Sequence, residues 1–489
     1  MNRSSARCRL ILVHLLLFFA VFSGSILSAA DERPNILFIM VDDLGKEWIS
    51  SYGAEGIETP NIDHLAETGI RFKNAYSMPQ CTPTRLTLLT GQYPFEHGWT
   101  NHYDVPRWGS GVHFDPDRNA SVARVLRQAG YATAIAGKWQ IDDFRVEPNA
   151  LHEAGFDAWS VWTGGEGGNL KKSGPRYWNP YIHQGTRGNT ASKTRDRFGP
   201  DIFTDFLIDF MKGHSDQPFF LYYPMVLTHH PIVSTPAEPD VNGKTKKFKA
   251  MVRYTDRLVG RLARALEKEG EREDTIIIFT ADNGSPGDVT GRRNGRKING
   301  QKGQMSEPGV AMPFIVSGPS MVPEGRVTDA LTDFTDLLPT FADLAGTAPN
   351  DRWNVHGRSI APFLLGEAED TPRDWIYAQG GGFAEFKNNR TVPAQPFDDR
   401  VIRTKRWKLW VSEQRKPVRL YNVKKDPDES NNLIDSDDPA AKRAKKSLWK
   451  VIKKMPKTDH APRYEPNPAQ PWDKYDYAGP DEAPDRRFR

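Results

Sequence analysis

The chain of 489 residues is too long for one small hydrophobic core, and its length favours a large domain with a smaller one. Hydrophobic residues make up 38% and charged residues 26% of the sequence, which is typical of a globular protein and excludes a disordered chain. Of the 66 basic residues three lie in the first 30 positions, which hold no acid, so 63 remain against 62 acidic residues. This balance gives no support for nucleic-acid binding.

The first 30 residues have the pattern of a secretory signal peptide. A basic start precedes an apolar run over residues 10–22, and small residues follow up to Ala30. The apolar run is too short to predict a stable membrane span. We therefore expect an exported protein, periplasmic or secreted, after cleavage near Ala30. An uncleaved N-terminal anchor is the alternative.

Cys81 is the one cysteine that the mature protein would keep, because Cys8 leaves with the leader. No intramolecular disulfide is then possible, so a lone exported cysteine calls for a chemical role or a modification. A helix predicted to begin near Thr82 would place Cys81 at its positive end and Arg85 one turn further on. A sulfur atom beside a fixed cation is placed to act on an anion.

Buried strands alternate with helices over most of the mature chain. The predicted strands are residues 35–41, 131–137, 218–223 and 275–281; the predicted helices are residues 60–69, 82–91, 119–130, 202–211, 249–270 and 328–346. A long loop rich in glycine and tryptophan is expected over residues 155–198. This alternation predicts an α/β fold with a large mixed, mostly parallel sheet flanked by helices.

Beyond Thr371 the sequence changes to short strand-like pieces, which predict a small antiparallel sheet with a helix over residues 439–454. The expected division of the chain is a signal peptide (1–30), a catalytic domain (31–370), a small C-terminal α+β subdomain (371–455) and an extended, Pro-rich tail (456–489).

Polar side chains follow several predicted strands at the point where each strand ends. They are Asp42, Asp43, Lys138, His229, Asp282 and Asn283. The carboxyl ends of strands in an α/β sheet form the edge where ligands bind, so we expect these side chains to lie together. Three carboxylates and an amide oxygen would repel one another without a cation, and such hard ligands suit Ca²⁺ or Mg²⁺ better than zinc. Taken alone, the pair Asp42–Asp43 could be a turn or a helix cap, and the pair Asp282–Asn283 could be a turn.

These motifs give the chain a resemblance to the type I sulfatases, the formylglycine-dependent members of the alkaline phosphatase superfamily. Residues 81–85, Cys-Thr-Pro-Thr-Arg, match the C-x-P-x-R signature of that family. Further segments resemble the family's pattern in the same order: residues 34–43, 137–139, 280–284, 302–313 and 420–433. The matches cover nearly the whole mature chain.

The resemblance implies that Asp42, Asp43, Asp282 and Asn283 bind one Ca²⁺ ion, Mg²⁺ being the less suitable metal, with residue 81 contributing to the same site. It also implies that a formylglycine-generating enzyme converts Cys81 to formylglycine (3-oxoalanine) during export. The hydrate of this aldehyde offers one hydroxyl to attack sulfur and a second to expel sulfate afterwards.

The resemblance assigns the remaining catalytic roles to four side chains. Arg85 would orient the aldehyde hydrate, and Lys138, His229 and Lys302 would bind the sulfate oxygens. His229 or Lys302 would protonate the departing alcohol. This chain departs from the family at Gln140, where a histidine is usual, and at residues 307–309, where Glu-Pro-Gly replaces Glu-Gly-Gly.

Several features outside this constellation bear on the substrate. The basic segment 291–297 is either a solvated loop or a subsite for further anionic groups of a glycan. Trp159, Trp162 and Trp178 either stack on sugar rings or pack in the core. Two glycosylation sequons begin at Asn119, which is alternatively a helix cap, and at Asn389.

We therefore expect an exported sulfuric ester hydrolase of the arylsulfatase type that acts on sulfated carbohydrate. One alternative is a phosphodiesterase or phosphonate monoester hydrolase that uses the same residues. Another is a sulfoglycan-binding protein whose turnover is impaired at Gln140, because glutamine cannot carry a proton near neutral pH as histidine does.

Overall fold

The computed structural model describes residues 33–101, 114–142, 144, 146–162, 176–186, 190–381, 385–387, 390–392 and 395–465. The chain divides between Arg33 and Pro34 into two units, and every element named below belongs to the second, larger unit. The leader expected over residues 1–30 lies outside the described residues. Within the described part of the chain, no helix combines the length and the apolar character needed to cross a bilayer.

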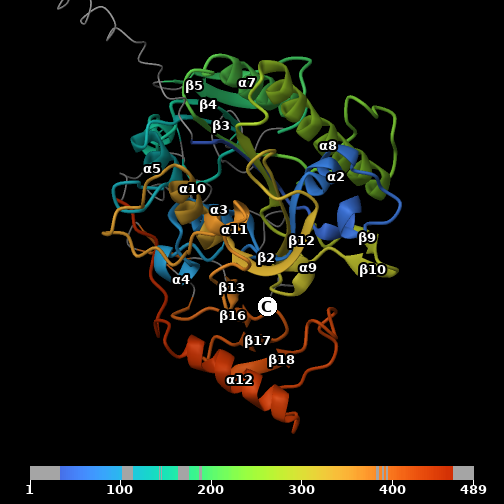
Figure 1. Ribbon diagram of the computed structural model, residues 1–489, viewed down its shortest axis with the longest axis vertical. Helices are drawn as coiled ribbons and strands as arrows, with labels where there is room; N and C mark the ends of the chain where they lie inside the picture. Colours follow the sequence, from blue (N-terminus) through green and yellow to red (C-terminus); the bar gives the residue numbers. More distant parts are fainter. Residues whose placement is uncertain are drawn as a thin grey trace, which may run out of the picture. The chain divides into compact units, whose positions relative to one another are not determined.

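A ten-stranded mixed sheet forms the centre of the larger unit (Figure 1). Its strands, in spatial order, are β12 (Arg326–Asp333), β2 (Gly69–Tyr76), β11 (Ala311–Ser317), β8 (Thr275–Ala281), β1 (Asn35–Val41), β7 (Phe219–Pro224), β3 (Ala132–Lys138), β4 (Ala158–Trp162), β5 (Tyr181–Gly185) and β6 (Thr190–Lys193). The five strands from β8 to β4 run parallel, whereas β11 and β5 are antiparallel to both of their neighbours.

The central strand β1 is apolar on both faces because helices cover both faces of the sheet. All seven of its residues from Asn35 to Val41 are buried. Phe38 packs on Tyr222 and Phe341 on one face, and the alternate residues Leu37 and Ile39 belong to the core on the other face.

Two layers of helices enclose the sheet. One layer consists of α2 (Pro60–Glu67), α7 (Gly199–Lys212) and α8 (Lys244–Glu269). The other consists of α3 (Cys81–Thr90), α5 (Val122–Gln128), α10 (Leu337–Leu344) and α11 (Ala361–Leu364). The predicted α/β class with a large mixed sheet is therefore confirmed.

A separate four-stranded antiparallel sheet follows in the chain, below the large sheet in Figure 1. It consists of β13 (Ile376–Gln379), β16 (Arg400–Arg403), β17 (Lys408–Val411) and β18 (Pro417–Tyr421), with α12 (Pro439–Ile452) packed against it. The predicted C-terminal sheet and helix are confirmed.

Short elements connect these layers. They are the 3-10 helices η1 (Lys46–Trp48), η2 (Ser50–Tyr52) and η3 (Phe334–Asp336), the helices α4 (Pro94–His97), α6 (Ala150–Ala154) and α9 (Glu307–Val310), and the two-stranded sheets β9 (Thr290–Arg293) with β10 (Arg296–Asn299) and β14 (Glu385–Lys387) with β15 (Arg390–Val392).

Three predictions of secondary structure are wrong in part. The loop expected over residues 155–198 contains the strands β4, β5 and β6. The helix expected over residues 328–346 is the edge strand β12 followed by η3 and α10, because pairing with β2 decides the conformation of a segment whose polarity fits either structure. The helix expected over residues 119–130 is the shorter α5.

Residues 456–465 of the predicted tail form no helix or strand, yet part of this segment is buried. Asp459 is 6% exposed and pairs with Arg400 of the small sheet at 2.8 Å. Residues 466–489 lie outside the described part of the chain.

Candidate active site

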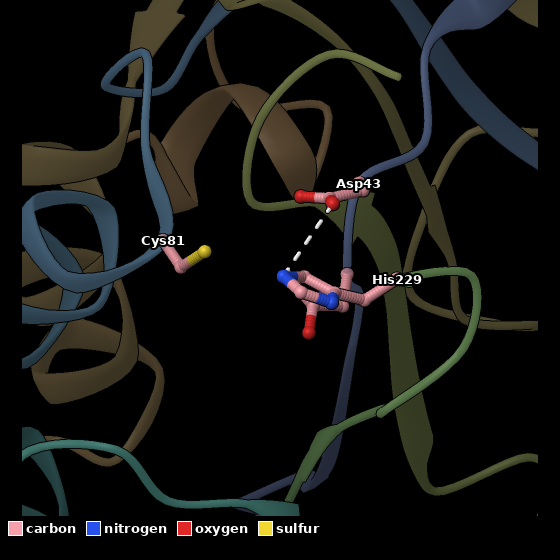
Figure 2. A group of neighbouring side chains, drawn as sticks. Asp43, Cys81 and His229 are labelled. Carbon is pink, nitrogen blue, oxygen red and sulfur yellow. Dashed lines mark ion pairs between the residues drawn. The ribbon is translucent and has the colours of Figure 1, made fainter. Parts of the chain in front are cut away.

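The polar residues predicted to share one edge of the sheet do lie together. Asp42 and Asp43 follow β1, Lys138 ends β3, His229 follows β7, and Asp282 with Asn283 follows β8. Cys81 is the first residue of α3, which follows β2. Figure 2 shows Asp43, Cys81 and His229 directed into one space from three elements far apart in the chain.

The local sequence fixes Cys81 at the beginning of its helix. Gln80 is extended, and Pro83 occupies the first turn, where a missing N–H group breaks no helical hydrogen bond. Thr84 Oγ1 donates to the carbonyl oxygen of Asp282 at 2.7 Å and so ties the helix to the end of β8. Gly91, with φ of 66°, ends the helix in a left-handed conformation.

Carboxylate and amide groups form a linked acidic cluster. The Asp43 amide donates to Asp282 Oδ1 at 3.0 Å, and Asn283 Nδ2 donates to Asp43 Oδ1 at 2.7 Å. One ligand atom each of Asp42, Asp43, Cys81 and His229 lies within 4.8 Å of the others. Asp282 is not one of these four residues, but it adjoins them, because its two carboxylate oxygens contact the Asp43 amide and Arg85.

The cluster fits a hard cation. Asp42 Oδ1 and Asn283 Oδ1 are buried and have no hydrogen-bond partner among the described residues. Leaving buried oxygens without a partner is unfavourable by about 1–3 kcal/mol each. A cation with oxygen ligands would satisfy both atoms, and carboxylate and amide oxygens are the ligands that Ca²⁺ and Mg²⁺ prefer.

Three cationic side chains contact the acidic cluster; those of Arg85 and Lys138 are buried, and that of Lys302 is 21% exposed. Arg85 Nη2 lies 2.9 Å from Asp282 Oδ2, Lys138 Nζ lies 2.7 Å from Asp42 Oδ2, and Lys302 Nζ lies 2.7 Å from Asp43 Oδ1. The structure thus brings together every side chain that the sequence assigned to the site.

His229 is held in a fixed orientation. Its Nδ1 donates to the carbonyl oxygen of His230 at 2.8 Å, which leaves Nε2 facing Asp43 Oδ2 at 3.7 Å. Tyr177 donates its hydroxyl proton to the carbonyl oxygen of His229. Burial, with Lys302 and Arg176 nearby, holds the pKa of His229 well below its usual value, so the ring is neutral near pH 7.

The Cys81 side chain is 1% exposed, and burial raises the pKa of its thiol. A protonated thiol is a poor nucleophile, so the unmodified side chain is unsuited to direct attack.

One charged residue at this edge was not predicted. Arg176 Nη1 lies 3.9 Å from Asp42 Oδ2, and its guanidinium stacks on Trp162 with the charge 4.1 Å from the ring centroid. It lies in a segment without sequence periodicity, and no motif marks it. Only the fold places it beside Asp42.

The other predictions about binding residues have mixed outcomes. Trp159 and Trp162 are core residues of β4, at 0% and 3% exposure, so they do not form a stacking surface; Trp178 is 38% exposed. The basic segment 291–297 is a β-hairpin and not a loop, with Arg292 paired to Glu55 and Arg296 to Asp428.

The sequons also differ from one another. Asn119 is fully buried, and its amide donates to the carbonyl oxygens of Asp115 and Arg463, so the folded chain does not offer it for glycosylation. It is not the cap of α5, which is Ser121. Asn389 lies outside the described residues.

Comparison with known proteins shows similarity to sulfatases over most of the chain. A family model described as Sulfatase matches residues 34–347, and a second, described as N-sulphoglucosamine sulphohydrolase, C-terminal, matches residues 300–458. Arylsulfatase A of Homo sapiens is 30% identical over 451 residues, 83% of this chain and 84% of that protein. N-acetylgalactosamine-6-sulfatase of Canis lupus familiaris is 30% identical over 373 residues, 72% of this chain and 70% of that protein.

Solved structures share the fold. A sulfatase from Pseudoalteromonas sp. superposes with a TM-score of 0.69 at 23% identity, covering 96% of this chain and 97% of that chain. The phosphonate monoester hydrolase of Agrobacterium radiobacter does so with a TM-score of 0.60 at 21% identity, covering 87% and 97%. The chain therefore belongs to the sulfatase family, whose members are sulfuric ester hydrolases with an alkaline phosphatase-like fold.

Proposed function

We propose that this protein is an exported sulfatase that hydrolyses sulfate esters of carbohydrate, using formylglycine made from Cys81 and one bound Ca²⁺ ion. The observation that carries the proposal is the shared space of Cys81, Asp42, Asp43 and His229, whose ligand atoms lie within 4.8 Å of one another. The leader pattern of residues 1–30 supports export.

The metal-binding residues would be Asp42, Asp43, Asp282 and Asn283, together with residue 81. The ion would neutralise the buried carboxylates and polarise oxygens of the sulfate ester. The aldehyde hydrate at residue 81 would supply two hydroxyls on one carbon, one as nucleophile and one to release the bound sulfate. Arg85 lies one turn along α3 from residue 81 and would orient that hydrate.

The remaining side chains act on the ester itself. Lys138 and Lys302 present ammonium groups where negative charge develops on the sulfate oxygens, and fixed charges in a buried site stabilise such a transition state strongly. When the ester S–O bond breaks, the departing alcohol oxygen needs a proton. Lys302, whose ammonium carries protons, would deliver it, or His229 would do so after gaining a proton on Nε2.

The carbohydrate assignment rests on what the relatives are named for. N-acetylgalactosamine-6-sulfatase is a relative at 30% identity, and Trp178 keeps an exposed aromatic surface that a sugar ring can stack on.

Parallel assays test the reaction class. Purified protein would be given an aryl sulfate, a sulfated amino sugar, an aryl phosphodiester and an aryl phosphonate monoester. We expect the largest kcat/KM with a sulfate ester. Lys302→Ala should lower it by at least about 10²-fold, whereas Lys442→Ala, an exposed control, should not. A larger kcat/KM for the diester or phosphonate would favour the hydrolase class represented by the Agrobacterium structure.

Gln140 favours the second alternative, a glycan-binding protein with impaired turnover. Its Oε1 is buried without a hydrogen-bond partner among the described residues, and an amide cannot carry a proton near neutral pH as histidine does. If sulfated glycan binds to fully converted protein without release of sulfate, and Gln140→His restores release, the binding role replaces the enzymatic one.

A further inference from the structure

Arg176 lies beside Asp42 in the candidate active site. Its Nη1 is 3.9 Å from Asp42 Oδ2, the oxygen that already accepts a 2.7 Å hydrogen bond from Lys138 Nζ. The Lys138 ammonium therefore neutralises Asp42 at bonding distance, and Arg176 lies beyond it. Only 11% of the Arg176 side chain is exposed.

Nη1 of Arg176 is buried and has no hydrogen-bond partner among the described residues. A guanidinium has five N–H donors in a planar fork. Burying such a group without partners is strongly unfavourable, because its hydration is lost and nothing replaces it. Nη1 therefore calls for an acceptor that the described residues do not supply.

Two contacts hold Arg176 in place beside the sulfate-binding residues. Its guanidinium packs over the ring of Trp162, the last residue of β4. Trp162 is the register partner of Lys138 on the adjacent parallel strand β3. The next residue, Tyr177, bonds through its hydroxyl to the carbonyl oxygens of Val226 and His229. Arg176 is thus fixed with respect to both Lys138 and His229.

The charges of the site also favour binding of an anion, because positive side chains outnumber carboxylates. Arg85, Lys138, Arg176 and Lys302 are positive. They face three carboxylates, those of Asp42, Asp43 and Asp282. A bound divalent cation would increase the positive excess, so the site is completed by a negatively charged ligand.

We propose that Arg176 is an additional sulfate-binding residue, which donates two N–H groups to oxygens of the substrate's sulfate group. The inference rests on the proposed sulfatase function and adds a residue to it. A planar fork matches two oxygens of a tetrahedral anion, and Trp162 fixes the plane of that fork in advance.

Titration of inorganic sulfate into the calcium-loaded mature protein tests the proposal. Arg176→Gln should weaken sulfate binding by about tenfold to a hundredfold, the range for hydrogen bonds to charged groups. Arg176→Lys keeps the charge but lacks the planar fork of N–H donors, so its affinity for sulfate should lie between those of Arg176→Gln and the unaltered protein. Arg197→Gln, at an arginine with a 53% exposed side chain paired to Asp205, is the matched control.

Steady-state kinetics separate binding from a purely structural role. Arg176→Gln should raise KM more than it lowers kcat, with unchanged calcium content and Tm. Unchanged sulfate affinity in both variants would overturn the inference, as would a loss of calcium or a lower Tm that fully accounts for the weaker binding. If the unaltered protein releases sulfate from esters and only this test fails, Arg176 alone is misassigned. If the unaltered protein neither binds nor releases sulfate, the proposed function fails with it.

Discussion

At the residue scale, the site is defined by buried oxygens that lack a hydrogen-bond partner in the described part of the chain. Asp42 Oδ1 and Asn283 Oδ1 have none among the described residues, while Lys138 and Lys302 bind other oxygens of the same cluster. A cluster built in this way would bind a cation and an anion next to each other, as the proposed hydrolysis of a sulfate ester requires.

Asp42→Asn tests the metal site directly. Loss of the carboxylate charge should abolish stoichiometric calcium binding, measured by elemental analysis after gel filtration. Calcium should raise the Tm of the unaltered protein after treatment with a chelator, because a ligand at 100 times its Kd stabilises by about 2.7 kcal/mol. The variant should lose this calcium-dependent shift.

The matched control is Asp205→Asn, which removes an acid whose side chain is 44% exposed. This variant should keep both the bound calcium and the calcium-dependent rise in Tm. A variant at Asp42 that retains one equivalent of calcium would show that the ion binds elsewhere.

The residues that carry a motif could be predicted from the sequence, because strand ends converge in an α/β sheet. Asp42, Lys138 and Asp282 were placed in this way. Arg176 could not be predicted, since it approaches Asp42 only through the path of an irregular segment. The burial of Trp159 and Trp162 also depends on the strand β4, which the sequence pattern did not reveal.

At the element scale, four of the five parallel strands, β8, β1, β7 and β3, could be predicted because their two-sided burial gives continuous apolar runs. The strands at or near the edges, β2, β5, β6 and β12, could not, because a strand buried on one face only has mixed polarity. Pairing with neighbours distant in the chain fixes them as strands.

Glu307 in α9 joins the large sheet to the small one through buried charges. Its Oε1 lies 3.4 Å from Arg403 Nε and 3.3 Å from Lys408 Nζ, and Tyr76 donates its hydroxyl proton to the same oxygen. Glu307→Gln should lower the free energy of unfolding by about 3 kcal/mol, because it leaves buried cations less well neutralised. Urea unfolding at neutral pH measures this change, with the exposed Glu324→Gln as control.

The effect of Glu307 should depend on pH. Burial acts to raise the pKa of Glu307, but Arg403 and Lys408 outweigh it and hold the pKa at about 2, below the ordinary 4.5. A lowered pKa in the folded state adds stability above pH 4.5 that is lost as the pH falls toward 2. The difference between the two proteins should therefore shrink below pH 4.5. A difference that stays constant to pH 2 would show that the charge of Glu307 does not stabilise the fold.

At the scale of the whole molecule, the described part of the chain forms a three-layer α/β unit with a small antiparallel sheet beside it. The small antiparallel sheet could be predicted because the sequence changes to short strand-like pieces beyond Thr371. The role of residues 456–465 could not, because the burial of Asp459 against Arg400 depends on a contact 59 residues apart. The segment expected to lie over the surface thus contributes a buried ion pair to the small sheet.

The central claim is that residue 81 of the exported protein is an aldehyde and not a thiol. The mass of the tryptic peptide spanning residues 74–85, taken from a preparation that releases sulfate, tests it most directly. Formylglycine makes this peptide about 18 Da lighter than the cysteine form, and the lighter fraction should rise in proportion to specific activity. A peptide that carries only unmodified cysteine in fully active protein would contradict the account.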